Sequence, residues 1–138
     1  MTALFADTFY WIALSDPADS AHQLALQLTA ERATWQFVTT DEVLTEYLSF
    51  FSSVPASARR EAADVAEDPL ASSVVRVIPQ SRDSFRFGLQ LYRARPDKGY
   101  SLTDCISMQA MRRKGLTDIL TNDKHFEQEG FRALFRDC

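Results

Sequence analysis

The sequence has little cysteine and no long hydrophobic segment, and each shortage argues against a class of protein. Its two cysteines, Cys105 and Cys138, fit no metal-binding spacing, so we expect neither a cysteine-held metal nor a disulfide. No apolar run approaches the length of a membrane span, and no secretion signal opens the chain. These features predict a cytoplasmic protein with no membrane association.

Common nucleotide-binding motifs are also missing, and basic residues are not in excess. The chain has no glycine-rich fingerprint after its first predicted strand and no Walker loop, which argues against a dinucleotide cofactor and against nucleotide hydrolysis. The net charge of −4 argues against a protein that simply coats nucleic acid. We find no repeat, low-complexity tract or linker either.

The composition is that of a globular protein, with 46% hydrophobic and 25% charged residues. A length of 138 residues favours a single domain that covers residues 1–138. Apolar and amphipathic segments alternate, which predicts an α/β fold with a central parallel sheet and helices on both faces. Strands are predicted at 3–6, 35–38, 74–78, 118–121 and 131–135, and helices at 8–14, from 16–17 onward, and at 40–51, 55–67, 81–93 and 104–114.

Apolar patterns within the predicted helices indicate how they pack. The helix that begins at Asp104 is apolar on most sides, so we expect it to be buried. In the 81–93 helix, Phe85, Leu89 and Tyr92 fall in register along one side. A further group of aromatic residues fits either a large core or a groove for a partner helix. That group is Trp11, Tyr47, Phe50 and Phe51.

Four acidic residues stand where the local pattern does not explain them. Asp7 follows the first strand, Glu46 borders an apolar helix stripe, Asp104 opens the buried helix, and Asp123 follows the fourth strand. Separately, each has an ordinary interpretation as a turn residue, a solvated helix residue or a helix cap. Because sites in parallel sheets form at the carboxyl ends of the strands, we expect the four to converge.

Several carboxylates at contact distance need a cation, since like charges raise one another's pKa. An all-oxygen set of ligands suits a hard divalent ion such as Mg²⁺ or Mn²⁺ rather than zinc. Such an ion activates a water molecule and offsets charge on phosphate oxygens during in-line displacement. The acidic set therefore predicts hydrolysis of a phosphodiester bond.

Four segments carry these acids together with neighbouring hydroxyl groups, and the segments span nearly the whole chain. They are Ala6-Asp7-Thr8, Thr39-Thr40 through Glu46, Ser101-Leu102-Thr103-Asp104-Cys105, and Leu120-Thr121-Asn122-Asp123-Lys124-His125-Phe126. In this order and spacing they resemble the PIN-domain endoribonucleases, specifically the single-domain VapC-type toxins of bacterial toxin–antitoxin pairs. One position departs from that pattern, because many relatives have a second hydroxyl where this chain has Phe9.

The resemblance implies a PIN-like three-layer sandwich around a parallel sheet of five short strands. It also implies an endoribonuclease, the toxin of a type II pair, that hydrolyses RNA phosphodiester bonds with a water activated by Mg²⁺ or Mn²⁺. The implied protein partners are a second copy of the chain, forming a homodimer, and a cognate antitoxin. The implied catalytic and metal-binding residues are Asp7, Glu46, Asp104 and Asp123.

Other side chains near the acids are candidates for supporting roles. Hydroxyl and amide groups could hydrogen-bond a carboxylate or a phosphate, although capping of strand and helix ends is the alternative. These candidates are Thr8, Ser101, Thr103 and Asn122. Basic groups could bind RNA, although for the histidine a structural hydrogen bond is the alternative. These candidates are Arg93, Arg95, Lys98, Lys124 and His125.

Two other functions stay open at this point. The chain could be a metal-dependent nuclease that acts on DNA or on structured nucleic acid, which deoxy substrates would distinguish. It could also be a non-catalytic PIN-like binding module, in which the acids hold the fold or a partner. The substitution Asp104→Asn separates that module from an enzyme, because only a catalytic role predicts a harmless and well-folded variant.

Overall fold

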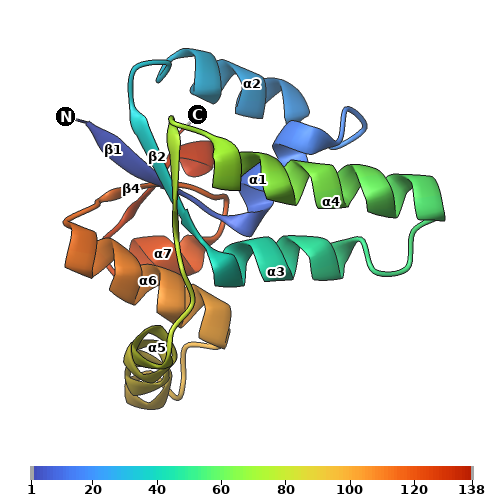
Figure 1. Cartoon of the computed structure of the whole chain (residues 1–138). Coiled ribbons are helices and arrows are strands. Elements are labelled where there is room, and N and C mark those ends of the chain that lie inside the picture. Colours follow the sequence, from blue (N-terminus) through green and yellow to red (C-terminus); the bar gives the residue numbers. More distant parts are fainter. Residues whose placement is uncertain (1, 138) are drawn as a thin grey trace.

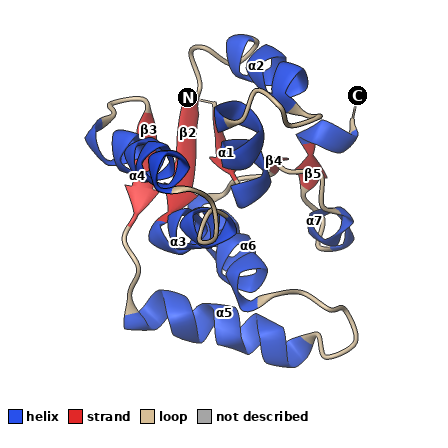
Figure 2. Ribbon diagram, turned by 90° about the vertical axis from the view of Figure 1, so that its right-hand side faces the viewer, coloured by secondary structure: helices blue, strands red, loops and turns tan. Residues whose placement is uncertain are grey.

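The computed structural model describes residues 2–137, so Cys138 and the prediction made for it lie outside the described residues. The sheet has five strands in the order β3-β2-β1-β4-β5, and every neighbouring pair is parallel. Helices lie on both faces of the sheet (Figures 1 and 2), so the predicted parallel α/β architecture is confirmed. The strands are β1 (Ala3–Ala6), β2 (Gln36–Thr40), β3 (Val75–Ile78), β4 (Asp118–Leu120) and β5 (Arg132–Ala133).

The helices connect these strands and supply most of the outer layers. They are α1 (Thr8–Ser15), α2 (His22–Ala30), α3 (Asp41–Phe50), α4 (Ala56–Ala71), α5 (Arg82–Ala94), α6 (Leu102–Lys114) and α7 (Lys124–Gln128), with a final 3₁₀ turn at Leu134–Arg136. Among residues 2–137, no helix is long and apolar enough to cross a membrane.

The central strands and α6 form the middle of one continuous core. Leu4 and Phe5 of β1 and Ile119 of β4 are fully buried, as short apolar strands of a parallel sheet should be. Met108 and Met111 of α6 are fully buried as well, which confirms the prediction for this helix. Each such side chain contributes about 1.5–3 kcal/mol on burial, so the centre of the sheet is held firmly.

Several element boundaries differ from the predictions, and local hydrogen bonds explain the first of them. The second helix begins at His22 rather than at Asp16-Pro17, because Asp16 accepts a hydrogen bond from the Ala18 amide at 2.9 Å and stabilises a turn instead. Helix α4 runs on to Ala71, past the predicted end at 67. The predicted strand at 131–135 is only two residues long, and the short helix α7 was not predicted.

Helix α5 does not pack through the side that carries Phe85, Leu89 and Tyr92, although their apolar register suggested that it would. It packs along α6 and stands away from the sheet (Figures 1 and 2). Gly88 faces Ile106 so closely that a Cβ at this position would overlap the isoleucine side chain. The close contact buries Gly88 and Leu91 and leaves Phe85 and Tyr92 42% and 50% exposed. The aromatic stripe of α5 therefore lies on the surface.

Candidate active site

The four predicted acids meet at the carboxyl edge of the sheet, although they come from distant parts of the chain. Asp7 directly follows β1, Glu46 lies in α3 after β2, Asp104 lies in the first turn of α6, and Asp123 follows β4. Together with neighbouring residues they line an open pocket of about 440 Å³. The lining residues are Asp7, Thr8, Phe9, Glu46, Ser101, Asp104, Thr121, Asn122 and Asp123.

Asp7 is the most deeply buried member of this acidic pocket, with only 6% of the residue exposed. The Thr121 hydroxyl donates a hydrogen bond to its Oδ2 at 2.9 Å, while Oδ1 is buried with no partner among the described residues. Burial, followed by repulsion from Asp104, raises the pKa of Asp7 to about 7. A buried carboxylate that has one unpartnered oxygen and a raised pKa is the kind of group that a bound cation stabilises.

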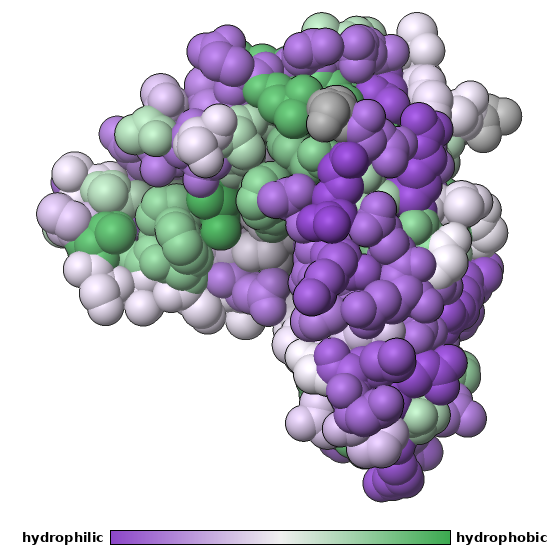
Figure 3. Space-filling view, turned by 180° about the vertical axis from the view of Figure 1, so that it is seen from behind, coloured by the Kyte–Doolittle hydropathy of each residue, from purple (hydrophilic) through white to green (hydrophobic). Residues whose placement is uncertain are grey.

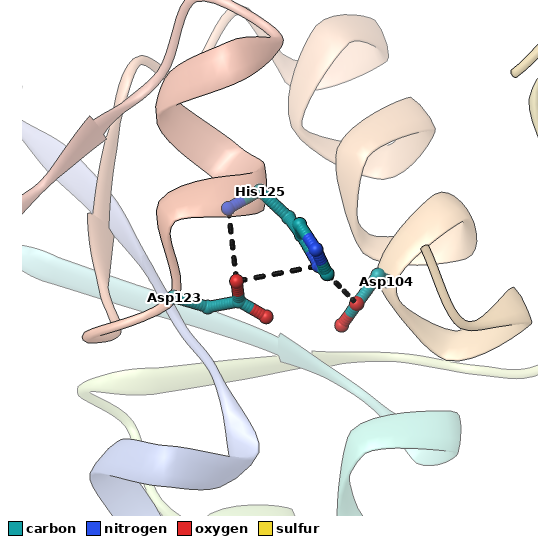
Figure 4. A group of neighbouring side chains, drawn as sticks. All are labelled: Asp104, Asp123 and His125. Carbon is teal, nitrogen blue, oxygen red and sulfur yellow. Dashed lines mark hydrogen bonds and ion pairs between the residues drawn. The ribbon is translucent and has the colours of Figure 1, made fainter. Parts of the chain in front are cut away.

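Asp104, Asp123 and His125 form the tightest group in the pocket region. They offer ligand atoms within 4.8 Å of one another, and their side chains point toward a common space (Figure 4). The His125 Nδ1 atom lies 3.3 Å from Asp123 Oδ1 and 3.8 Å from Asp104 Oδ2. Burial and then repulsion from Asp123 raise the pKa of Asp104. This arrangement is a possible metal-binding group.

Asp104 serves as a helix cap and as a pocket acid at the same time. The Ser101 hydroxyl accepts a hydrogen bond from the Asp104 amide at 3.0 Å, and Asp104 Oδ2 accepts one from the Ser101 amide at 3.4 Å. This capping box holds the carboxylate at the N-terminus of α6, where the helix dipole favours negative charge. The two interpretations of this residue from sequence are therefore compatible.

Hydroxyl groups of the pocket orient its carboxylates. Thr8, which is buried, donates a hydrogen bond to Glu46 Oε1 at 2.5 Å and fixes that side chain across from α1. Thr121 contacts Asp7 and also accepts a hydrogen bond from the Asp123 amide at 3.3 Å. Sequence analysis missed Thr121, whose only signal was a hydroxyl at the end of a buried strand. Thr103 lies outside the pocket, in a neighbouring groove.

The predicted basic residues do not surround the acids. Of the five, only His125 belongs to the acidic group, and Arg93, Arg95, Lys98 and Lys124 do not line the pocket. The short helix α7 brings the histidine back toward Asp104, because the Asp123 carboxylate accepts a hydrogen bond from the His125 amide at 2.8 Å. Sequence analysis missed this placement since it did not predict α7.

Arg95 instead belongs to a second carboxylate cluster, centred on Glu129. Glu129 accepts hydrogen bonds from Arg95 Nε, from Arg112 and from the Tyr100 hydroxyl, each at 2.9 Å. Burial alone would raise the pKa of Glu129, but the hydrogen bonds from Arg112, Arg95 and Tyr100 lower it to about 2. The Tyr100 ring lies against His125 with 5.0 Å between ring centroids, so this Glu129 cluster supports the acidic pocket from one side.

The donor set of the pocket fits a hard divalent cation. Carboxylate oxygens dominate it, one imidazole stands at its edge, and none of the described lysine or arginine side chains lines it. Two further features favour a bound cation, namely the unpartnered Oδ1 of Asp7 and the raised pKa values of Asp7 and Asp104. A cation there would stabilise the ionised forms of both groups.

Known proteins with similar sequence and structure share this architecture. No family model matches the chain. The chain is 28% identical over 128 residues to the 23S rRNA-specific endonuclease VapC20 of Mycobacterium tuberculosis, covering 93% of this chain and 95% of the relative. The crystal structure of that protein, described as a sarcin–ricin loop cleaving toxin, superposes with a TM-score of 0.82.

Two more distant solved structures share the fold. They are VapBC2 from Rickettsia felis, bound to a DNA fragment from their promoter (TM-score 0.66, 15% identity, 96% and 97% of the two chains), and FitAcB from Neisseria gonorrhoeae (TM-score 0.61, 13% identity, 94% and 95%). The five-stranded parallel sheet with helices on both faces matches the PIN-like fold of VapC20. The chain has the PIN-like fold of VapC20, and its similarity to that protein in sequence and structure supports a VapC-type toxin ribonuclease.

Proposed function

We propose that the chain is a divalent-metal-dependent endoribonuclease and the toxin of a type II toxin–antitoxin pair. In this proposal, residues 1–138 act as one cytoplasmic nuclease domain. The observation that carries it is the convergence of four carboxylates in one open pocket, with a buried and unpartnered oxygen on Asp7. The similarity to VapC20, a 23S rRNA-specific endonuclease, supports RNA as the substrate.

Asp7 and Asp104 are the proposed direct ligands of the cation, with Asp123 and Glu46 completing the acidic shell. A divalent cation bound there lowers the pKa of water and offsets negative charge on the scissile phosphate. Thr8 holds Glu46 in position to accept a proton from the attacking water, and Thr121 holds Asp7. Water attacks phosphorus and gives one proton to Glu46, the bond to the 3′ oxygen breaks, and the leaving oxygen takes a proton from solvent. The products are a 5′-phosphate and a 3′-hydroxyl.

Mg²⁺ or Mn²⁺ is the proposed ion. Carboxylate oxygens suit both ions, whereas zinc sites use histidine and cysteine more heavily. Cys105 is buried in α6 and is not part of the pocket, so it supplies no thiolate ligand. A contribution from His125 would favour Mn²⁺ over Mg²⁺, because imidazole is the softer donor.

A cognate antitoxin and a second copy of the chain are the proposed protein partners. Apolar side chains gather on the arm where α3 and α4 project from the body (Figure 3), and at the end of α3 the side chains of Leu48 and Phe50 are exposed. Exposed apolar groups of this size favour protein contacts. Trp11 and Tyr47, by contrast, belong to the core, so only part of the predicted aromatic groove is available.

The test is a cleavage assay that varies both the metal and the nucleic acid. Purified protein is incubated with 23S rRNA, transfer RNA or single-stranded DNA in Mg²⁺, Mn²⁺ or EDTA, and the new ends are identified by sequencing. We expect cleavage of RNA in either metal, no cleavage in EDTA, and 5′-phosphate ends. Cleavage of DNA alone, or RNA cleavage that persists in EDTA, would contradict the proposal.

A further inference from the structure

A groove extends from the acidic pocket along the surface toward α5. Its first part, of about 450 Å³, lies between α3, α5 and α6 and shares Glu46 with the acidic pocket. A second part, of about 350 Å³, adjoins it and shares Glu42, Gln80, Phe85 and Ile106 with the first. The groove is therefore continuous with the acidic pocket and passes beside the exposed ring of Phe85.

The walls of this groove differ in chemistry in a way that suits a nucleobase. Phe85 and Ile106 give it apolar surface, and Thr45, Ser49 and Thr103 also line it and carry hydroxyl groups. Base stacking on an aromatic ring needs a flat apolar surface of this kind and tolerates any base. Glu42 and Glu46 on the α3 wall disfavour a phosphate inside the groove, so its occupant there should be uncharged.

The second part of the groove adds a positive charge beside Glu42. Arg82, at the start of α5, is exposed and lines the second part beside Phe85. A guanidinium group at this place matches the next phosphate of a strand whose base lies on the phenyl ring. The order of groups, from the acids of the pocket to the ring and then to the arginine, follows the order of scissile phosphate, base and next phosphate.

The outward position of Phe85 follows from the packing of its helix. Contact between Gly88 and Ile106 turns α5 so that Phe85 faces the groove, with 42% of the residue exposed. We infer that this groove holds one unpaired base of the RNA next to the scissile phosphate, stacked on Phe85. This inference rests on the proposed function, since it takes single-stranded RNA as the substrate of the acidic pocket.

Phe87 offers a matched control for the experiment. It lies on the same helix, has the same 42% exposure, and stacks with Arg113 outside the groove. Phe85→Ala, Phe85→Trp and Phe87→Ala are made in an Asp104→Asn background, which prevents cleavage. Binding of a fluorescein-labelled single-stranded RNA of about ten nucleotides is measured by anisotropy in Mg²⁺. Thermal melting verifies that each variant is folded.

We expect Phe85→Ala to weaken RNA binding between about 5-fold and about 100-fold, with Phe85→Trp near the parent and Phe87→Ala unchanged. Arg82→Ala should reduce the slope of log K for RNA binding against log salt concentration by about one, because one phosphate contact is lost. In the otherwise wild-type chain, Phe85→Ala should slow RNA cleavage at low RNA concentration, whereas Phe87→Ala should not.

Two results would overturn the inference. One is equal RNA binding and equal cleavage rates at low RNA concentration for Phe85→Ala and Phe87→Ala. The other is a change of oligomeric state in Phe85→Ala, seen by analytical ultracentrifugation, with RNA binding per chain unchanged, which would make the groove a contact between copies. Either result leaves metal-dependent cleavage by the wild-type chain intact, so failure of the groove is distinguishable from failure of the proposed function.

Discussion

The molecule contains two groups of shielded carboxylates whose electrostatic surroundings are opposite. In the acidic pocket, Asp7 faces other acids and keeps one oxygen without a partner, and its pKa rises to about 7. In the Glu129 cluster, a side chain that is only 5% exposed receives hydrogen bonds from two arginines and a tyrosine, and its pKa falls to about 2.

The difference separates a carboxylate that stabilises the fold from carboxylates to which the proposed function assigns the cleavage of RNA. Glu129 is neutralised by groups that the chain itself supplies, so the folded protein needs nothing further there. Asp7 is left without such partners, which costs stability and is tolerated where a cation or substrate supplies the missing charge.

Asp104→Asn should abolish RNA cleavage, with a loss of at least about 10³-fold, while leaving the protein as stable as the parent or more so. The substitution removes a metal ligand and, at the same time, a repulsive charge beside Asp123. Single-turnover rates and thermal melting in EDTA measure the two effects. Substantial cleavage by the variant would place the catalytic charge elsewhere.

The metal-free protein should lose stability as the pH rises from about 4 to about 7, because Asp7 binds its proton more tightly in the folded state than in the unfolded state. The loss of unfolding free energy from Asp7 reaches about 4 kcal/mol above the folded pKa, and there is no such loss below the unfolded pKa. Urea unfolding across this pH range measures it. In Asp7→Asn the slope should flatten, and an equally steep slope would show that another group is responsible.

Mg²⁺ or Mn²⁺ should stabilise the folded protein by about 2.7 kcal/mol at a hundred times its dissociation constant, since only the folded chain assembles the site. Thermal melting with increasing metal at pH 7 measures this shift. The shift should shrink in Asp7→Asn and persist in Glu129→Gln. A shift of the same size in both variants would indicate that the ion binds outside the acidic pocket.

Glu129→Gln should show the reverse of Asp104→Asn, with stability reduced by about 1–3 kcal/mol and cleavage only modestly slowed. Its matched control is Glu127→Gln in α7, where the exposed pair with Arg136 at 2.7 Å is worth less than about 1 kcal/mol. Urea unfolding at pH 7 compares the two variants. Lowering the pH toward about 2 should erase the difference for Glu129, because its contribution disappears as the carboxylate is protonated.

Much of the architecture could be predicted from local patterns. The apolar runs around Phe5 and Ile119 predicted buried strands, and the alternation with helices predicted their parallel arrangement. The rule that carboxyl ends of parallel strands share an edge then predicted that Asp7 and Asp123 lie near each other. The structure brings both into one pocket.

Contacts between residues far apart in the chain could not be predicted in this way. Thr121 and Asp7 are 114 positions apart, and Arg95 and Glu129 are 34 positions apart. A hydroxyl after a strand or an arginine in a loop has many possible partners, and no local periodicity selects one of them. For that reason Arg95 was a candidate for RNA binding, whereas the structure pairs it with Glu129.

Local periodicity was enough to predict the class of fold, and residue type together with the resemblance to PIN-domain toxins singled out four candidate acids. The environment of each charge depends instead on how the chain packs. Burial and neighbours, which are properties of the packed chain, leave Asp7 without a counter-charge and surround Glu129 with three donors. Packing also sets which side of α5 faces solvent, since the contact between Gly88 and Ile106 places Phe85 at the surface.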